Sequence, residues 1–328
     1  MESNNRIYLA GHSGLVGSAI RRSLVRHGFQ NIALRTHAEL DLTDKVAVDA
    51  FFQAERPEYV FLAAAKVGGI LANNTYPADF IRENLEIQTH VIDACFRYGV
   101  DRMIFLGSTC FYPKLCPQPI KEEYLLTSEL EPTNRPYALA KIAGLEMCWA
   151  YNRQYGTRFL ATAPTNLFGP GDNYNLQDSH VLPALIRKVA EAKANGQKEV
   201  VVWGTGTPRR ELLYSDDMAD ACVFLMNLGD AGFASLLSLD RAPLINIGTG
   251  EDLSIRELAE LVCRELGFDG QLVFDATKPD GTPRKLTDSS RIQALGWRPK
   301  VSLATGIRLA YEAAKAEFIP IVSTRTEA

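Results

Sequence analysis

The chain has 328 residues, of which 46% are hydrophobic and 23% charged, the composition of a globular protein with one large domain or two modest ones. Its 35 basic and 39 acidic residues leave a formal charge of −4, so charge gives no reason to expect nucleic acid or an anionic membrane as a partner. Six scattered cysteines without C-x-x-C spacing predict neither a metal site nor a disulfide framework. The polar N-terminus and the lack of a long apolar run predict a soluble, cytoplasmic protein with free thiols and no membrane segment.

The first predicted elements are a short buried strand, Ile7 to Ala10, and a helix that begins near Leu15. The turn between them places Gly11, Gly14 and Gly17 at G-x-x-G-x-x-G spacing. We expect the first glycine to permit the turn, the second to let a pyrophosphate approach the backbone, and the third to allow close packing of helix on strand. Such spacing also occurs in turn-rich loops, but its place directly after the first strand favours a dinucleotide site.

The residues that follow the second predicted strand, 31–34, bear on the choice of dinucleotide. An acid at this point would bind the ribose 2′-hydroxyl of NAD, whereas an arginine accommodates the 2′-phosphate of NADP. The chain has Arg35, followed by Thr36 and His37. Arg35 can also be an ordinary solvated strand end, but the absence of an acid here favours NADP(H).

Two later strands end in residues suited to a ligand site. The strand predicted at 59–65 ends in alanines, which leave room for a ligand, and a glycine loop at 66–70 and a long helix within 73–99 follow it. The strand predicted at 102–107 delivers Ser108 and Cys110 at its C-terminal tip. Open α/β sheets place their chemistry at such tips.

After a proline-rich loop, a helix is predicted from Tyr137 to about Tyr155. Tyr137 and Lys141 are four residues apart, so they stand on one face of this helix, one turn from each other. A tyrosine beside a lysine cation loses its proton more easily than its reference pKa of about 10 suggests. Y-x-x-x-K also arises by chance on solvated helices, but a nucleotide fold and a serine at an earlier strand tip favour a catalytic pair.

The regular alternation of strands and helices ends after a strand at 158–164, which indicates a second, smaller region. The elements expected there are a helix from His180, a strand at 200–203, a helix at 218–227 capped within Tyr214–Asp217, a strand at 244–247, a helix from the cap Ser254 to Leu266, a strand at 272–274, and a weakly ordered tail after about Ala316.

These elements predict an α/β fold: a doubly wound parallel sheet of the Rossmann type with a second, smaller substrate domain. We place the NADP-binding domain at residues 1–172 plus 215–250, and the discontinuous substrate-binding domain at 173–214 plus 251–328.

Three motifs, the glycine turn, Ser108 at a strand tip and Y-x-x-x-K at 137–141, together resemble the extended short-chain dehydrogenase/reductase superfamily. In that superfamily Ser, Tyr and Lys polarise a carbonyl while a nicotinamide delivers hydride. Longer runs resemble the GDP-L-fucose synthase family, whose members are 3,5-epimerase/4-reductases of GDP-4-keto-6-deoxy-D-mannose. These runs include A-A-A-K-V-G-G-I-L-A-N-N (63–74), S-T-C-F-Y-P-K (108–114), R-P-Y-A-L-A-K (135–141), S-H-V-L-P-A-L (179–185), V-V-W-G-T-G-T-P-R-R-E (201–211) and K-P-D-G-T-P-R-K (278–285).

The resemblance implies that Ser108 and Tyr137 bind the carbonyl, and that Lys141 lowers the tyrosine pKa and holds the nicotinamide ribose. It also implies that Cys110 and His180 are the acid/base pair for epimerisation. Protons on C3 and C5 are acidic because these carbons flank the C4 ketone, and the donors that stabilise the enolate later serve the C4 oxyanion. Taken alone, Cys110 would more often be a small buried hydrophobe and a lone histidine structural.

The resemblance further implies the ligand contacts. NADP(H) would be held by Gly11, His12, Ser13, Gly14, Leu15, Val16, Gly17, Arg35, His37, Asp41, Leu42, Ala64, Leu106, Gly107, Lys141, Pro164, Thr165, Asn166, Leu167 and His180. The GDP-sugar would be held by Lys188, Trp203, Arg210 and Asp280, with Arg209 and Lys285 either assisting or merely solvated. Some relatives have Arg where this chain has Ser13 and His37, so the preference for NADP rests mainly on Arg35.

The expected activity is therefore double epimerisation of a GDP-4-keto-6-deoxyhexose followed by NADPH-dependent reduction at C4. Two alternatives stay open: a related epimerase/reductase such as a GDP-L-colitose synthase, and a non-catalytic NADP-binding sensor or scaffold, although the latter typically lacks the Tyr or Lys retained here.

We also expect a homodimer through the helices at 82–98 and 137–155, because the superfamily pairs these helices. Each helix carries a second apolar stripe, whose residues could instead be buried within one chain: Leu85, Val91, Cys95, Leu145, Cys148 and Trp149.

Overall fold

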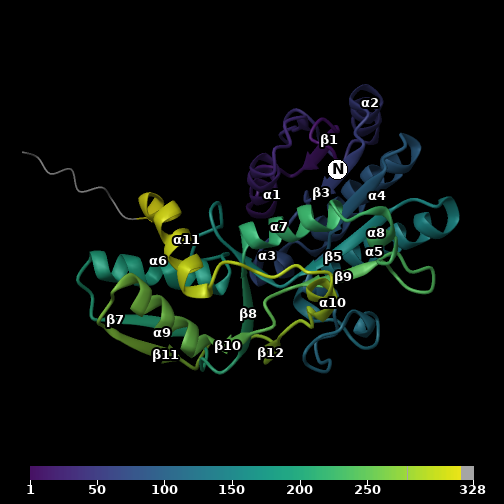
Figure 1. Ribbon diagram of the computed structural model, residues 1–328. Coiled ribbons are helices and arrows are strands. Elements are labelled where there is room, and N and C mark those ends of the chain that lie inside the picture. The colour runs from purple at the N-terminus through teal and green to yellow at the C-terminus, as the bar shows by residue number, and fades with distance from the viewer. Residues whose placement is uncertain (279, 319–328) are drawn as a thin grey trace, which may run out of the picture.

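The computed structural model describes residues 1–278 and 280–318 (Figure 1). Its larger part is built on a six-stranded parallel sheet with the order β2-β1-β3-β4-β5-β9. The strands are β1 (Ile7–Ala10), β2 (Ile32–Ala33), β3 (Tyr59–Leu62), β4 (Arg102–Leu106), β5 (Phe159–Pro164) and β9 (Leu244–Ile247). Because β2 and β3 lie on opposite sides of β1, the winding direction reverses there and leaves a crevice at the carboxyl ends of β1 and β3. The predicted doubly wound α/β sheet is confirmed.

Helices cover both faces of this sheet. On one face α1 (Leu15–Arg26) packs beside α7 (Ser215–Met226); on the other lie α2 (Lys45–Glu55), α4 (Pro77–Arg97) and α5 (Arg135–Tyr155). Strand β1 shows why the sequence requires both layers: Ile7 and Leu9 enter one apolar core, whereas Tyr8 enters the other. A strand that is apolar on both sides is stable only when both sides are covered.

Short elements follow the carboxyl ends of β3 and β4. Helix α3 (Ile70–Thr75) leads into α4, and three 3₁₀ turns, η1 (Thr109–Phe111), η2 (Glu122–Tyr124) and η3 (Pro132–Asn134), lie in the segment between β4 and α5. Helix α3 packs against η3, immediately before α5. The loops expected at these two strand tips therefore contact each other.

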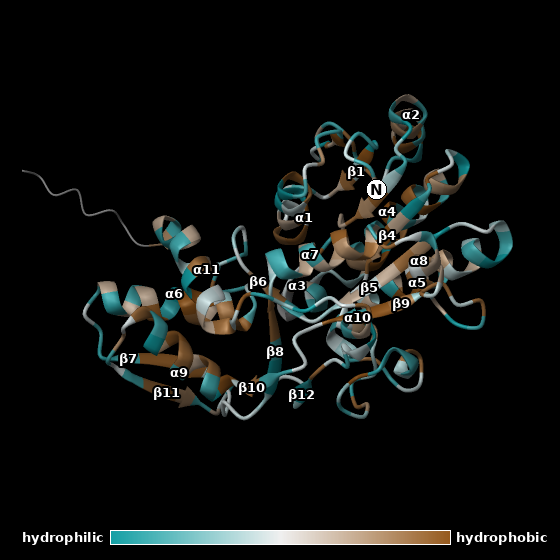
Figure 2. Ribbon diagram, viewed as in Figure 1, coloured by the Kyte–Doolittle hydropathy of each residue, from teal (hydrophilic) through white to brown (hydrophobic). Residues whose placement is uncertain are grey.

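The smaller region is organised around β8 (Arg209–Tyr214). β6 (Asn166–Phe168) and β12 (Arg284–Lys285) pair with it in parallel, and β10 (Asp252–Ser254) pairs with it antiparallel. A separate two-stranded sheet joins β7 (Glu199–Trp203) to β11 (Gln271–Asp275). Helices α6 (Val181–Ala194), α9 (Ile255–Leu266) and α11 (Leu303–Phe318) enclose a third apolar core. Figure 2 shows strands of the large sheet such as β5 and β9 mainly in the apolar colour, whereas β12 and part of β8 in the smaller region are hydrophilic and the helices carry mixed faces.

Several predictions of local structure can be compared with these elements. The cap at Ser254 is confirmed: its side chain and that of Glu257 form a reciprocal capping box at the start of α9. The N-cap of α7, Tyr214, falls within the predicted range Tyr214–Asp217, but its side chain makes no capping hydrogen bond, and the predicted helix start at Met218 is wrong. Helix α7 begins at Ser215, and Asp217 instead accepts hydrogen bonds from the backbone of Lys300 and Val301, far along the chain.

Strand β8 and helix α11 were not predicted. The helix α11 continues past Ala316 to Phe318, and the remainder of the predicted weakly ordered tail lies outside the described residues.

The division into two discontinuous domains stays a prediction. Ile292, from α10 (Ser290–Ala294), and Trp297 lie in the predicted substrate domain but pack into the core beneath α1 and α7, next to α8 (Asp230–Ala234).

None of the helices in the described ranges is long and apolar enough to cross a membrane.

Candidate active site

The glycine turn forms a close junction between β1, β3 and α1. Gly11 has φ +82°, and a Cβ on it would lie 2.6 Å from the backbone nitrogen of Ala64. A Cβ on Gly17 would lie 1.9 Å from the carbonyl oxygen of Gly11, so only glycine lets α1 begin this close to the strand. At Gly14 a Cβ would meet only that same oxygen, at 3.7 Å, which leaves the turn open on its outer side. No acidic residue occupies the first turn of α1. This cradle fits a pyrophosphate.

Other residues expected to contact the dinucleotide lie at the carboxyl ends of neighbouring parallel strands. Leu106 ends β4 and Gly107 follows it, and Pro164 to Leu167 lead from β5 into β6. Within the crevice His12 leaves Nδ1 buried without a hydrogen-bond partner in the described part of the chain. A buried polar atom of this kind usually has a ligand or water partner, and its position beside the glycine cradle suits a dinucleotide.

Arg35 is not free, contrary to the expectation that no acid opposes it. Its guanidinium donates to Glu55, at the C-terminal end of α2, and to the carbonyl oxygen of Leu34, and lies 5.3 Å from the centroid of the Phe51 ring. The second oxygen of Glu55 is paired with Arg6. The cation is thus held in place, but part of its charge is neutralised before any phosphate arrives.

The remaining residues near the second strand add little positive charge. The His37 side chain is 84% exposed, with Asp41 3.9 Å away. Asp41 instead accepts hydrogen bonds from the backbone and hydroxyl of Thr43, and these bonds lower the pKa of its carboxyl. Leu42 is buried, and its carbonyl oxygen accepts from a ring nitrogen of His90. Asp41 and Leu42 therefore shape the turn.

Four predicted catalytic residues meet at the carboxyl end of β4. Ser108 caps the turn η1, with its Oγ accepting a hydrogen bond from the Cys110 backbone nitrogen at 3.2 Å. Tyr137, in the first turn of α5, is hydrogen-bonded to Ser108 and lies close to Cys110. Lys141 is 3% exposed; its Nζ donates to the Leu106 carbonyl oxygen at 2.9 Å and lies 5.9 Å from the centroid of the Tyr137 ring.

The electrostatics of this cluster differ from the expected effect of a lysine on a tyrosine. Burial and the neighbouring Cys110 raise the pKa of Tyr137, although the hydrogen bond from Ser108 opposes the shift. Burial lowers the pKa of Lys141 to about 8. Desolvation is the largest cause of the shift of each group, so the chain's own residues keep Tyr137 protonated at neutral pH. Such a tyrosine suits a proton donor to an oxyanion.

His180 belongs to the smaller region, where it is the N-cap residue of α6. Its side chain is exposed, yet desolvation by surrounding protein atoms and the charge of Lys285 lower its pKa. The loop that leads to it abuts the larger region: a Cβ on Gly69, at the start of α3, would lie 2.6 Å from the carbonyl oxygen of Asp178. Because α3 also packs on η3 before Tyr137, the two regions meet beside the catalytic cluster.

The four residues expected to bind the GDP-sugar come from α6 (Lys188), the end of β7 (Trp203), the start of β8 (Arg210) and the loop before β12 (Asp280). Trp203 is 59% exposed, with the Lys188 ammonium 5.3 Å and the Lys278 ammonium 5.6 Å from its ring. Sequence reasoning missed Lys278, although it precedes Asp280 by only two residues. An exposed aromatic ring between two cations suits a ligand that has a flat base and negative charge.

Arg210 and Asp280 are tied to the same loop. Arg210 donates to the Thr282 carbonyl oxygen at 2.6 Å, and burial lowers its pKa. Asp280 accepts hydrogen bonds from the backbone nitrogen and the hydroxyl of Thr205, at 3.0 and 2.7 Å. The predicted binding residues are therefore brought together on one rim of the smaller region.

Comparison with known proteins agrees with this geometry. The NAD dependent epimerase/dehydratase family matches residues 7–238. The chain belongs to this family. GDP-L-fucose synthase 1 from Arabidopsis thaliana is 57% identical to it over 311 residues, which are 95% of this chain and 93% of the relative. GDP-L-fucose synthase from Escherichia coli (strain K12) is 51% identical over 94% of this chain and 96% of the relative.

A solved structure shares the fold over nearly the whole chain. MlghC, a GDP-mannoheptose C4 reductase from Campylobacter jejuni with NADP bound, superposes with a TM-score of 0.88 at 43% identity, covering 96% of this chain and 99% of that one. The resemblance of this epimerase/dehydratase family member to the GDP-L-fucose synthases is confirmed.

We predict that Arg35→Ala lowers the preference for NADPH over NADH by about tenfold, because one charge-assisted contact with the 2′-phosphate is lost. Because Glu55 already neutralises part of the Arg35 charge, we expect this loss of preference to be no larger. The measurement is kcat/KM with each cofactor. Arg6→Ala is the matched control: it removes a positive charge paired with the same carboxylate but keeps Arg35, so it should lower the ratio clearly less than Arg35→Ala does. Equal ratios for wild type and Arg35→Ala would contradict this role.

We predict that Lys285→Gln moves the alkaline limb of the epimerisation rate to higher pH. Desolvation and Lys285 both lower the pKa of His180, so removing the lysine charge stabilises the imidazolium and raises that pKa. An acid with a raised pKa stays protonated to higher pH. Exchange of solvent deuterium into the sugar, followed across pH, measures the limb. A limb that stays in place or moves to lower pH would contradict the assignment of His180 as the acid.

Proposed function

We propose that this protein is an NADP-dependent GDP-L-fucose synthase, which epimerises GDP-4-keto-6-deoxy-D-mannose at C3 and C5 and then reduces it at C4. The observation that carries the proposal is the cluster of Ser108, Cys110, Tyr137 and Lys141 at the end of β4, beside a dinucleotide cradle. The high identity to GDP-L-fucose synthases over nearly the whole chain supports the substrate and the cofactor.

In the reduction, the bound NADPH supplies hydride for C4 of the sugar. The protein's part is to hold and protonate the C4 oxygen. Ser108 and Tyr137 lie close enough together to donate hydrogen bonds to one oxygen, and Tyr137, whose pKa is raised, passes its proton to that oxygen. Lys141 holds the helix of Tyr137 against the end of β4 through Leu106.

In the epimerisation, a base removes the proton from the carbon and an acid returns one on the opposite face. Cys110 lies next to Ser108 and Tyr137, so its sulfur can take the carbon-bound proton while their two hydroxyls stabilise the enolate oxygen. His180, which comes from the smaller region, returns a proton to the carbon. One pocket thus serves both reactions because both place negative charge on the same oxygen.

The nucleotide part of the substrate is assigned to the rim of the smaller region. Trp203 stacks on the base, while the cations of Lys188 and Arg210 neutralise the diphosphate charge. Asp280 holds the loop through Thr205 and offers an acceptor to the ligand.

Location in the cytoplasm stays a prediction.

Incubation with GDP-4-keto-6-deoxy-D-mannose and NADPH, with the product identified by NMR, tests the function. GDP-L-fucose is the expected product. Faster turnover of another GDP-4-keto-deoxyhexose would favour a related enzyme such as a GDP-L-colitose synthase, and NADPH binding without turnover of either sugar would favour a sensor or scaffold.

We predict that Tyr137→Phe abolishes reduction but leaves slow deuterium exchange into the sugar, because Ser108 alone still donates to the enolate oxygen. Cys110→Ser should lose the exchange, since a hydroxyl near neutral pH is too weak a base for a carbon-bound proton, while the reducing residues stay in place. His180→Gln should stall epimerisation with NADPH still bound. Cys110→Ser that makes the normal product at near wild-type rate with full deuterium incorporation would show that the thiol is structural.

We propose a homodimer through α4 and α5, although most of the expected apolar stripe serves the chain's own core. Val91, Cys95, Leu145 and Cys148 are each 0% exposed and belong to the core under these helices, so that part of the argument is wrong. Leu85 and Trp149 stay partly exposed. Analytical ultracentrifugation should show a dimer at micromolar concentration that Leu85→Asp weakens. A wild-type monomer would remove the proposal.

A further inference from the structure

A wholly buried carboxylate lies at the centre of the smaller region. Glu211, in β8, is 0% exposed, yet both of its carboxylate oxygens accept hydrogen bonds. One oxygen accepts from the backbone nitrogen and the hydroxyl of Thr287, at 2.8 and 2.6 Å. The other accepts from the Gly250 nitrogen at 2.8 Å and the Thr249 hydroxyl at 3.4 Å. A carboxylate without water is costly unless its lone pairs are met in this way.

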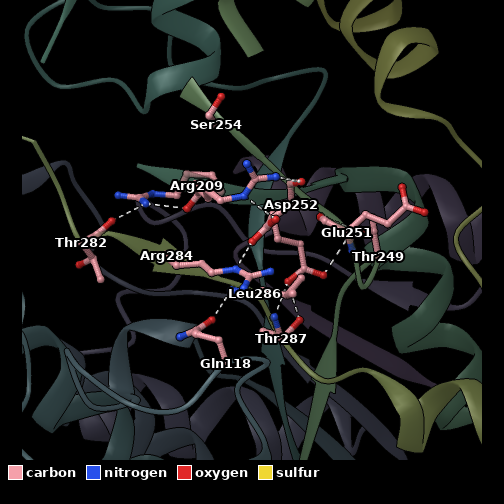
Figure 3. Close-up of polar contacts among 12 residues, drawn as sticks. Gln118, Arg209, Thr249, Glu251, Asp252, Ser254, Thr282, Arg284, Leu286 and Thr287 are labelled. Atoms are coloured by element: carbon pink, nitrogen blue, oxygen red, sulfur yellow. Dashed lines mark hydrogen bonds and ion pairs between the residues drawn. The ribbon is translucent and has the colours of Figure 1, made fainter. Parts of the chain in front are cut away.

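Thr287 belongs to a short stretch, Arg284–Ser289, that runs between two functional parts and is here called the connecting segment. On one side its Leu286 is bonded to the loop after the catalytic turn, donating to the Gln118 side chain at 2.9 Å and accepting from the Ile120 nitrogen at 2.7 Å. On the other side it pairs as β12 with Arg209 and Arg210 of β8. Figure 3 shows Gln118, Leu286 and Thr287 below the strand that carries Arg209.

The N-terminal end of the connecting segment is held by ion pairs. The Asp252 side chain, 5% exposed, receives both Arg209 and Arg284, and Figure 3 shows it between the two guanidinium groups. Arg210 lies between Arg209 and Glu211 in β8, and it donates to the carbonyl oxygen of Thr282, in the loop just before the segment. The position of that loop, which also carries Asp280, therefore depends on where the segment is held.

The contact between Glu211 and Thr287 leaves no space for a ligand. A Cβ on Gly248 would lie 2.3 Å from a Glu211 carboxylate oxygen and 2.3 Å from the Thr287 hydroxyl. Both side chains are thus enclosed by backbone, so neither can touch a substrate. Their effect on a reaction must pass through the segment that they hold.

We propose that Glu211 and Thr287 are positioning residues that set affinity for the GDP-sugar, by locking the connecting segment and with it the loop that carries Asp280 and meets Arg210. The proposal rests on the substrate-site assignment of Arg210 and Asp280 made above. The glycine cradle at β1 and α1 contacts none of these groups in the described residues, whereas Thr165 and Asn166, two of the expected cofactor contacts, donate to the backbone carbonyl oxygen of Glu211. Removing the Thr287 hydroxyl leaves those two bonds in place, so cofactor affinity should change less than affinity for the GDP-sugar.

Two substitutions at one position test the lock. Thr287→Val keeps the shape of the side chain but removes the hydroxyl, and should raise KM for the GDP-sugar about tenfold while KM for NADPH changes less than twofold. Thr287→Ser keeps the hydroxyl and loses only a methyl group, and should stay within about twofold of wild type. A purely packing role predicts the reverse order. That reverse order, or equal rises in both KM values for Thr287→Val, would overturn the proposal.

Three further variants separate the possible failures. Ile307→Val removes one methyl group from the apolar core of the smaller region and changes none of the contacts of the segment described above, so it should lower Tm and leave both KM values unchanged. Glu211→Gln puts an amide group against N–H donors and should repeat the Thr287→Val pattern. Arg210→Ala tests the assignment beneath the proposal: if it leaves KM for the GDP-sugar unchanged, the substrate site is wrong. If it raises that KM and Thr287→Val does not, only the lock is wrong.

Discussion

The catalytic geometry depends on one buried ammonium group. Lys141 is enclosed at the junction of α5 and β4, where its Nζ donates to the Leu106 carbonyl oxygen and lies 4.8 Å from the centroid of the Phe105 ring. Breaking that contact would leave a buried charge unpaired, which is far more costly than losing an ordinary surface contact. Helix α5 therefore cannot slide along the strand, and Tyr137, one turn earlier, is held beside Ser108. The register of one helix on one strand thus decides which two hydroxyls meet.

The two regions share buried polar contacts as well as the apolar packing of Ile292 and Trp297. Asn246, at 0% exposure in β9, accepts from the Tyr112 hydroxyl at 2.6 Å and donates to the carbonyl oxygens of Ile120 and Asp288. Asn246 and Glu211 thus form a buried polar junction between the regions, and its hydrogen bonds require a fixed geometry. Buried polar networks contribute little net stability, but they admit few alternative arrangements. Such a junction suits a cleft whose two walls must hold one substrate in register.

The parts of the fold that were predictable depend on local sequence. The glycine turn, the cap at Ser254 and the strand that delivers Ser108 at its tip are each set by residues within a few positions of one another. The errors involve residues that meet only in the folded chain. Glu55 is 20 residues from Arg35, and Thr287 is 76 residues from Glu211, so neither partnership leaves a pattern in a single sequence. Strand β8 was missed because its charged half is stabilised by partners from β10 and β12 rather than by alternation.

The raised pKa of Tyr137 resolves a conflict in the proposed reaction order. The resemblance to dehydrogenases predicted a tyrosine whose proton is easily lost, which suits alcohol oxidation, where the tyrosine takes a proton. Here epimerisation comes first and builds negative charge on the C4 oxygen before any hydride moves. A tyrosinate at that point would repel the enolate, whereas a neutral hydroxyl stabilises it. Burial raises the pKa of Tyr137 and lowers that of His180. The tyrosine therefore keeps its proton for the oxygen, whereas the histidine releases its proton readily to carbon.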